Sequence, residues 1–225
     1  MTSIAPPRPL GLLLREIQQE PQADGTVAVT LRTDQGPIRG RYHPSTTGDA
    51  AVLWVFGAGG GLGGPAGGVY DRLGRQLAAE GIASLELDYR RPADLAPCVL
   101  DVQVGLQFLR RQGKTRVILV GHSFGGAVVI TAGAQAAAVI GVVAMSSQLY
   151  GTDWVNQLSP RPLLRLHGTA DEVLPAWYSQ ELYERAQDPK QLRLYPGCRH
   201  GLDQCREALD QDLRDWIRAV VGPPQ

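Results

Sequence analysis

The chain contains few of the residues that metal sites and disulfide frameworks need. Its 225 residues include three cysteines, at positions 98, 198 and 205, and four histidines, and none of them has the spacing of a zinc site. An odd number of cysteines argues against a disulfide framework. Cys198 lies near His200 but has no nucleophile elbow, so it is expected to be a partly buried thiol rather than a nucleophile. The sequence therefore predicts no metal and no cofactor.

Net charge and long apolar runs are also absent. The chain has 22 basic and 22 acidic residues, which cancel, so no basic face for nucleic acid is expected. No apolar run approaches the length that spans a membrane. Residues 1–9 are rich in proline and lack the apolar stretch of a secretion signal. We therefore expect a soluble, cytoplasmic protein with no membrane span and no nucleic-acid partner.

Strand-like and helix-like segments alternate along most of the chain. Two runs, 27–32 and 38–42, are separated by a turn and predict an antiparallel pair. Beyond them, apolar runs typical of buried strands are separated by segments of helical periodicity. The expected strands are 51–56, 82–88, 116–120, 139–145, 163–166 and 192–195, and the expected helices are 70–80, 97–112, 127–138 and 205–220.

This alternation predicts the fold class. Strands that alternate with helices are typical of an α/β fold with a doubly wound, mostly parallel sheet, here with an antiparallel N-terminal strand pair. The sequence contains no repeat and no linker. Residues 1–25 are expected to form an N-terminal extension, and residues 26–225 a single domain.

The most informative motif is Gly-His-Ser-Phe-Gly at 121–125. It follows the apolar run 116–120 and precedes the helical run 127–138. A Gly-x-Ser-x-Gly between a strand and a helix is typical of a nucleophile elbow, whose glycines let neighbouring backbone pass close to a strained serine. The motif predicts Ser123 as a nucleophile, and the alternative is a serine that caps the helix.

An acid and a histidine occur where two later strands end. Asp171 follows the strand 163–166, with Glu172 beside it as a rival acid, and His200 follows the strand 192–195. Because parallel strands end at the same edge of a sheet, both groups are expected at the end of the sheet that carries Ser123. The alternatives are an acid that caps a helix and a histidine in a surface loop.

With these motifs in the order Ser, Asp, His, the chain from about residue 27 onward resembles the α/β-hydrolase superfamily. The form that it resembles is the small, lidless one of dienelactone hydrolases and carboxylesterases. The resemblance implies that Ser123 is the nucleophile, that His200 takes and returns its proton, and that Asp171 orients His200. It says little about the substrate.

A glycine-rich segment, 57–68, follows the strand 51–56. A phosphate-binding loop would need a Lys-Ser/Thr pair or a dinucleotide fingerprint, and the segment contains neither. Its place matches the oxyanion loop of the hydrolases, and the resemblance implies the backbone N–H groups of Ala58 and Phe124 as donors. Phe56 stands where the family has a histidine, which leaves the N–H donors in place but changes the support of the loop.

About seventeen residues separate the strands that end at Met145 and begin at Leu163. This segment is too short for the helical lid that many lipases insert there, so an open site without a cap domain is expected. Six residues near this edge of the sheet are candidates for an acyl pocket, with ordinary packing as the alternative: Leu62, Leu149, Tyr150, Trp154, Leu174 and Trp177.

Together these features predict a serine hydrolase that cleaves a carboxylic ester through an acyl-enzyme intermediate on Ser123. The expected partner is a small-molecule acyl substrate. Two alternatives stay open: a thioesterase, amidase or acyltransferase with the same triad, and a non-catalytic α/β-hydrolase scaffold used as a receptor or interaction module. The complete set of triad residues argues against the scaffold, because a binding module does not need all three.

Overall fold

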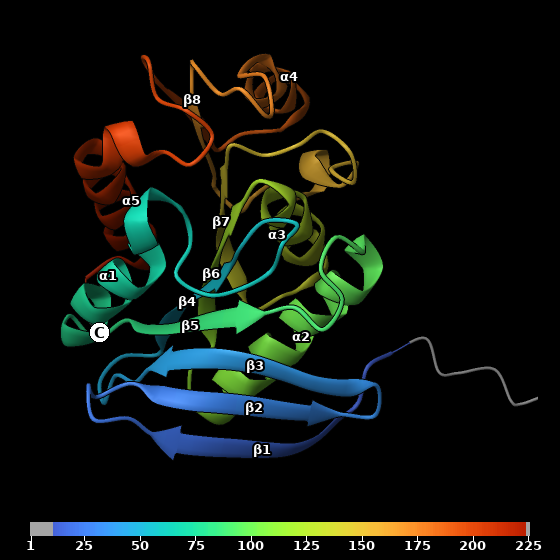
Figure 1. The fold of residues 1–225 in the computed structure, drawn as a ribbon, viewed down its shortest axis with the longest axis vertical. Helices are drawn as coiled ribbons and strands as arrows, with labels where there is room; N and C mark the ends of the chain where they lie inside the picture. The colour runs from blue at the N-terminus through green and yellow to red at the C-terminus, as the bar shows by residue number, and fades with distance from the viewer. Residues whose placement is uncertain (1–10, 224–225) are drawn as a thin grey trace, which may run out of the picture.

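The computed structural model describes residues 11–223 and contains a nine-stranded sheet with helices on both faces (Figure 1). The strands are β1 (Leu14–Pro21), β2 (Val27–Thr33), β3 (Gly36–His43), β4 (Ala50–Val55), β5 (Ala83–Asp88), β6 (Arg116–His122), β7 (Val139–Met145), β8 (Leu163–Gly168) and β9 (Lys190–Tyr195). The helices are α1 (Pro65–Ala79), α2 (Leu95–Arg111), α3 (Phe124–Gln135), α4 (Trp177–Arg185) and α5 (Arg206–Val221), with 3-10 turns η1 (Val155–Gln157) and η2 (Asp203–Cys205).

The sheet has the order β1-β2-β3-β5-β4-β6-β7-β8-β9. All neighbours from β5 to β9 are parallel, whereas β1, β2 and β3 are antiparallel to one another and β3 is antiparallel to β5. In Figure 1 the antiparallel strands form one edge of the sheet, and the helices flank the parallel part. The predicted α/β class, with a doubly wound, mostly parallel sheet, is confirmed.

Strand β4 shows why this sequence needs helices on both faces. All six of its residues are buried, and their side chains alternate between two apolar clusters. Leu53 lies in the cluster that includes residues of α2 and α3, whereas Val52 and Trp54 lie in the cluster that includes residues of α1 and α5. A strand covered on both faces carries a continuous apolar run rather than an alternating one.

Strand β1 is an element that the sequence analysis did not predict. Residues 14–21, within the expected N-terminal extension, pair antiparallel with β2 along its whole length. Five of its eight residues are polar and five are exposed, so no apolar run marks this edge strand. The expectation for residues 1–9 lies outside the described residues, and the domain boundary at residue 25 stays a prediction.

The expectation that Cys198 is a free thiol is wrong. Cys198 and Cys205 form a disulfide with their Cα atoms 5.8 Å apart, and Cys98 is a buried free thiol. Leu202, with a left-handed φ of 60°, turns the segment back so that the two cysteines meet. A count of cysteines cannot reveal such a turn. Because disulfides persist mainly in oxidising compartments, the cysteines no longer support a cytoplasmic location, which stays a prediction.

The segment between β7 and β8 contains one short turn, η1, and no inserted domain. The expectation of a sheet without a cap domain is therefore confirmed. Within residues 11–223, no helix is both long enough and apolar enough to cross a membrane.

Candidate active site

Ser123 lies at the turn between β6 and α3 in a conformation that L-residues rarely adopt. Its φ and ψ angles are 57° and −121°. A Cβ at Gly121 would collide with the carbonyl group of Gly125, and a Cβ at Gly125 would collide with the carbonyl oxygen of Phe56. Both glycines are therefore required for the close approach of backbone around the serine, as expected of a nucleophile elbow.

Ser123 lines a pocket of about 200 Å³. The other lining residues belong to the glycine-rich loop after β4, to the elbow and to the loop after β9: Phe56, Gly57, Ala58, Gly59, Gly60, His122 and His200. A Cβ at Gly57 would lie 3.5 Å from Cβ and 3.8 Å from Oγ of Ser123, so this loop closely borders the serine. Within residues 11–223, Ser123 Oγ makes no hydrogen bond. The pocket thus brings together Ser123, His200 and Ala58.

The side chain of His200 faces Asp171 rather than Glu172. His200 Nδ1 donates to Asp171 Oδ2 at 2.8 Å, whereas Glu172 Oε2 accepts the backbone N–H of His200 at 3.3 Å. The Asp171 carboxylate is fully buried, and its Oδ1 accepts the N–H groups of Val173 and Leu174 at 2.9 and 2.8 Å.

These contacts decide the charge of Asp171 and the tautomer of His200. Burial disfavours the carboxylate, but hydrogen bonds from Leu174, His200 and Val173 outweigh it and lower the pKa of Asp171. An ionised Asp171 only accepts, so the proton of the neutral His200 ring is on Nδ1. Nε2 is then the atom that is able to accept a proton.

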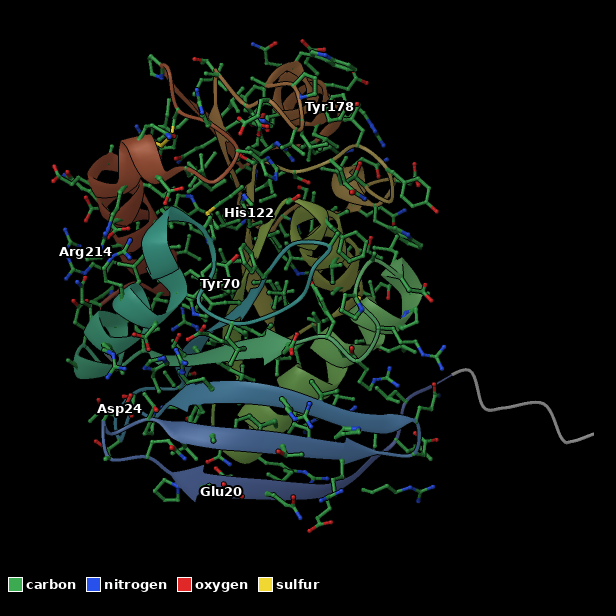
Figure 2. The ribbon with its side chains drawn as sticks, in the orientation of Figure 1. Glu20, Asp24, Tyr70, His122, Tyr178 and Arg214 are labelled. Atoms are coloured by element: carbon green, nitrogen blue, oxygen red, sulfur yellow. A yellow bond between two sulfur atoms is a disulfide. The ribbon has the colours of Figure 1, made fainter. Side chains whose placement is uncertain are left out.

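A second histidine of the pocket, His122, holds the backbone of His200. Its Nε2 lies 2.9 Å from the carbonyl oxygen of His200, and because a carbonyl only accepts, Nε2 carries a proton. The two ring centroids are 4.8 Å apart. Burial lowers the pKa of His122 to about 4, so this ring is neutral at neutral pH. Figure 2 labels His122 together with Tyr70, whose Oη donates to the carbonyl of Val55 at the end of β4.

Two carboxylates at the end of β5 hold the glycine-rich loop. The N–H of Gly61 donates to Asp88 Oδ1, and the N–H of Gly63 donates to Glu86 Oε2, both at 2.6 Å. Short hydrogen bonds to charged acceptors are stronger than bonds between neutral groups. Asp88 and Glu86 therefore set the position of the loop that borders Ser123.

The two N–H groups expected to form an oxyanion hole have no hydrogen-bond acceptor in a helix or strand of the part of the chain that the structure describes. Ala58 N–H makes no hydrogen bond among residues 11–223. Phe124 is the first residue of α3, where N–H groups have no intrahelical acceptor. Ala58 lines the pocket, and Phe124 directly follows Ser123.

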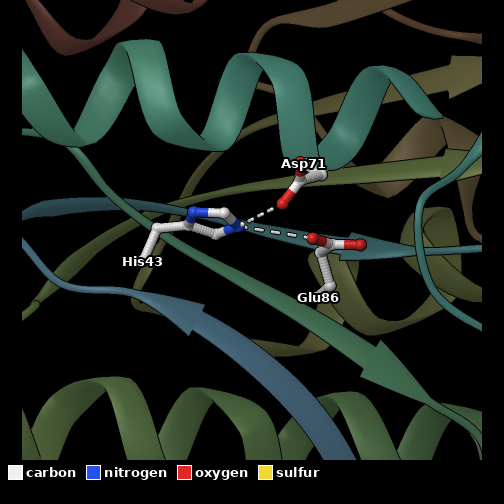
Figure 3. A group of neighbouring side chains, drawn as sticks. All are labelled: His43, Asp71 and Glu86. Carbon is white, nitrogen blue, oxygen red and sulfur yellow. Dashed lines mark hydrogen bonds and ion pairs between the residues drawn. The ribbon is translucent and has the colours of Figure 1, made fainter. Parts of the chain in front are cut away.

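Glu86 also belongs to a cluster with the buried His43 and the half-buried Asp71 (Figure 3). Their ligand atoms lie within 4.8 Å of one another, and His43 Nε2 lies 3.4 Å from Glu86 Oε1 and 3.7 Å from Asp71 Oδ1. Such a set resembles a metal site, but Arg41 Nη1 lies 3.1 Å from Asp71 Oδ1 and 3.6 Å from Glu86 Oε1. The guanidinium already supplies the positive charge that a metal ion would bring, so we assign this cluster to the support of the glycine-rich loop.

Comparison with known proteins identifies the family. The sequence profile described as "Alpha/beta hydrolase family" matches residues 19–223. The chain belongs to the alpha/beta hydrolase family. The uncharacterized protein YfhR of Escherichia coli (strain K12) is 34% identical over 76 residues, which are 32% of this chain. The match spans 27% of the length of that relative.

Solved structures share the fold of this alpha/beta hydrolase. The esterase domain of a Rhodothermus marinus protein has 20% identity and a TM-score of 0.71, over 88% of this chain and 99% of that chain. A dienelactone hydrolase from Anabaena variabilis has 17% identity and a TM-score of 0.73, over 91% of this chain and 99% of that chain. At these identities the likeness concerns the fold alone.

None of the six residues considered for an acyl pocket lines the described pocket at Ser123. Tyr150 borders a separate hollow of about 620 Å³ beside the start of α2, and Leu62 borders one of about 430 Å³ beside β2 and β3. Tyr150, Leu62, Trp154 and Trp177 are exposed, whereas the other two, at positions 149 and 174, are half-buried.

Sequence reasoning missed several groups around the candidate triad. They are His167 beside Asp171, the carboxylates Glu86 and Asp88 beneath the glycine-rich loop, and the disulfide whose loop contains His200. His167 lies directly after the predicted strand 163–166 and four positions before Asp171, and this place is the signal that would have pointed to it.

Proposed function

We propose that this alpha/beta hydrolase is a serine hydrolase that cleaves carboxylic esters through an acyl-enzyme intermediate on Ser123. One observation carries the proposal: Ser123 and His200 line one small pocket, and His200 Nδ1 donates to the buried carboxylate of Asp171 at 2.8 Å. A serine beside a histidine that an acid orients is the arrangement that activates a hydroxyl for attack on an acyl carbonyl.

Each group has a defined role in the proposed reaction. Asp171 accepts the Nδ1 proton of His200, so Nε2 takes the proton of Ser123 Oγ as the oxygen attacks the carbonyl carbon. His200 then gives this proton to the leaving alcohol. Water, deprotonated by the same histidine, hydrolyses the acyl-enzyme and restores Ser123. The hydrogen bond between Oγ and Nε2 is expected to form when substrate binds, because catalytic hydrogen bonds often form or tighten only in the complex.

The backbone N–H groups of Ala58 and Phe124 are proposed to bind the oxyanion of the tetrahedral intermediate. Ala58 lines the pocket and Phe124 is the first residue of α3, whose N-terminus favours negative charge. A donor that is already aimed at the developing charge contributes about 2.7 to 4 kcal/mol. The bonds of Asp88 and Glu86 to the glycine-rich loop support this orientation.

The same triad also suits thioester hydrolysis, amide hydrolysis and acyl transfer. Structural neighbours named as an esterase domain and a dienelactone hydrolase favour an ester. A non-catalytic scaffold agrees less well with the strained backbone at Ser123, because a binding module gains nothing from that strain. The small pocket and the absence of a cap domain support a small-molecule acyl substrate, and the six residues considered for the acyl group stay candidates for its contacts.

Labelling with a fluorophosphonate probe tests this proposal. The parent protein should be labelled covalently, and Ser123→Ala should not be, with thermal melts showing that both are folded. A p-nitrophenyl ester, a thioester and an anilide of the same acyl length then separate the substrate classes. A folded parent that is not labelled would support the scaffold, and faster turnover of the thioester or anilide would correct the class.

A further inference from the structure

The catalytic acid of the proposed triad lies between two histidines. Asp171 Oδ2 accepts His200 Nδ1–H at 2.8 Å and also lies 3.0 Å from Nε2 of His167. His167 is on β8, four residues before Asp171, and its side chain is fully buried. The proposed reaction gives this second histidine no role.

The hydrogen bonds around His167 determine its tautomer. Nε2 lies 2.9 Å from the carbonyl oxygen of Leu174, which only accepts, so Nε2 carries the proton and shares it between that carbonyl and Asp171 Oδ2. Nδ1 is therefore an acceptor, and it receives the hydroxyl of Ser179, on α4, at 2.6 Å. Ser179 Oγ in turn accepts Arg165 Nη2 at 2.7 Å.

Arg165 sets the direction of this chain of hydrogen bonds. A guanidinium only donates, so it turns the Ser179 hydroxyl toward His167, and His167 then donates toward Asp171. Arg165 is fully buried on β8, and within residues 11–223 its Nε and Nη1 atoms have no hydrogen-bond partner. Burial lowers its pKa to about 9, so it still carries a positive charge at neutral pH.

We propose that His167, oriented by Ser179 and Arg165, is a positioning residue that anchors the Asp171 carboxylate to β8. The negative charge of this carboxylate is then shared between His167 and His200. This inference rests on the proposed function. The ionisable groups around Asp171 are His167 and Arg165 on β8, Glu172 beside it and His200 in the loop after β9, and the His122 ring of β6 lies 4.8 Å from that of His200. Helix α4 contributes the uncharged Ser179.

Two substitutions of His167 separate the effect of its N–H donor from the effect of its side-chain volume. His167→Leu removes the Nε2–H donor, so the Asp171–His200 pair loses its anchor and kcat should fall about tenfold with KM changed by less than about twofold. The negative charge of Oδ2 would then act on His200 alone and favour its protonated form. The acid limb of the kcat/KM–pH profile should therefore move up by about half a pH unit. His167→Gln keeps an N–H donor and should stay close to the parent in both measurements.

Ser179→Ala tests whether the serine acts through His167. Without the hydroxyl donor, His167 is free to carry its proton on Nδ1, so part of the His167→Leu effect should appear. The double variant His167→Leu/Ser179→Ala should be no slower than His167→Leu, because both changes remove the same interaction. Ser84→Ala is the matched control: Ser84 is equally buried and accepts one hydrogen bond, from Trp54 Nε1, and its loss should leave the pH profile unchanged.

An NMR titration of the His200 ring makes the test independent of turnover. In folded His167→Leu protein the midpoint should rise, and in His167→Gln it should stay with the parent. If neither the midpoint nor the pH profile moves in folded His167→Leu and Ser179→Ala, the positioning role is overturned. If the parent shows no labelling at Ser123, the proposed function fails, and the NMR midpoints still decide whether His167 controls the Asp171–His200 pair. Should His167→Leu not fold, Ser179→Ala carries the same comparison.

Discussion

His200 Nδ1 donates a hydrogen bond of 2.8 Å to Oδ2 of Asp171, which lies 29 positions earlier in the chain. Glu172, the adjacent acid, accepts only the backbone N–H of His200, at 3.3 Å. Two neighbouring carboxylates therefore contact the same histidine in different ways, and only one of them faces its ring. This difference separates their expected contributions to catalysis.

Asp171→Asn should lower kcat by up to about 10⁴, because an amide in this place disrupts the tautomer in which Nε2 accepts the serine proton. Glu172→Gln keeps an oxygen that accepts the backbone N–H of His200, so its kcat should stay within about threefold of the parent. Steady-state hydrolysis of a p-nitrophenyl ester measures both. A harmless Asp171→Asn with a damaging Glu172→Gln would reverse the assignment of the acid.

Buried His122 should make stability depend on pH. Its pKa falls from 6.5 in the unfolded chain to about 4 in the folded protein, so between these values only the unfolded state binds the proton. The free energy of unfolding should be highest above pH 6.5 and decrease as the pH falls toward 4, by about 3 kcal/mol for this group. His167, whose pKa burial also lowers, adds a change of the same sign.

Urea unfolding of the parent and of His122→Gln between pH 5 and pH 8 measures this dependence. The glutamine keeps a donor for the carbonyl of His200 but does not titrate, so the curve of the variant should be flatter than that of the parent. Parallel curves would show that His122 is not the buried neutral group described above.

The backbone N–H of Ala58 should matter more than its side chain. Ala58→Gly keeps the donor and should retain most activity. Ala58→Pro removes the donor and should lower kcat by roughly 10² to 10³, with a smaller effect on KM, because the bond forms to charge that develops in the intermediate. Phe56→His, which restores the family residue, should change the rate only modestly. A folded Ala58→Pro with parental kcat would move the donor to another residue of the glycine-rich loop.

The disulfide should stabilise the loop that carries His200. Cys198 and Cys205 enclose His200, and the Cys198 carbonyl accepts Ala170 N–H at 2.9 Å, next to Asp171. The double variant Cys198→Ser/Cys205→Ser should lose about 2 to 3 kcal/mol of stability, or about 5 to 10 °C in Tm, with a lower kcat.

Dithiothreitol provides the control for this prediction. Reduction should lower the Tm of the parent toward that of the double variant and leave the double variant unchanged. Cys98→Ser, which alters the free buried thiol, should remain sensitive to the reductant. A parent whose Tm and kcat do not respond to full reduction would show that the loop does not depend on the bond.

Most of the fold was predictable because its signals are local. Nearly every strand predicted from an apolar run is present within a few residues of its expected bounds, for example Val139–Met145. Strand β1 was not predictable in this way, because residues such as Arg15 and Gln18 are polar and its place in the sheet depends on pairing with β2.

By itself, the sequence determined the α/β class, the strand–turn–helix context of Ser123 and the placement of Asp171 and His200 after two later strands, since each follows from patterns within a few residues. Only the tertiary structure decided which acid faces His200, that Cys198 bonds to Cys205, and that His167 shares Asp171 Oδ2 with His200. These relationships depend on distances of about 3 Å or on backbone turns between separate segments, which the spacing of residues along a chain does not specify.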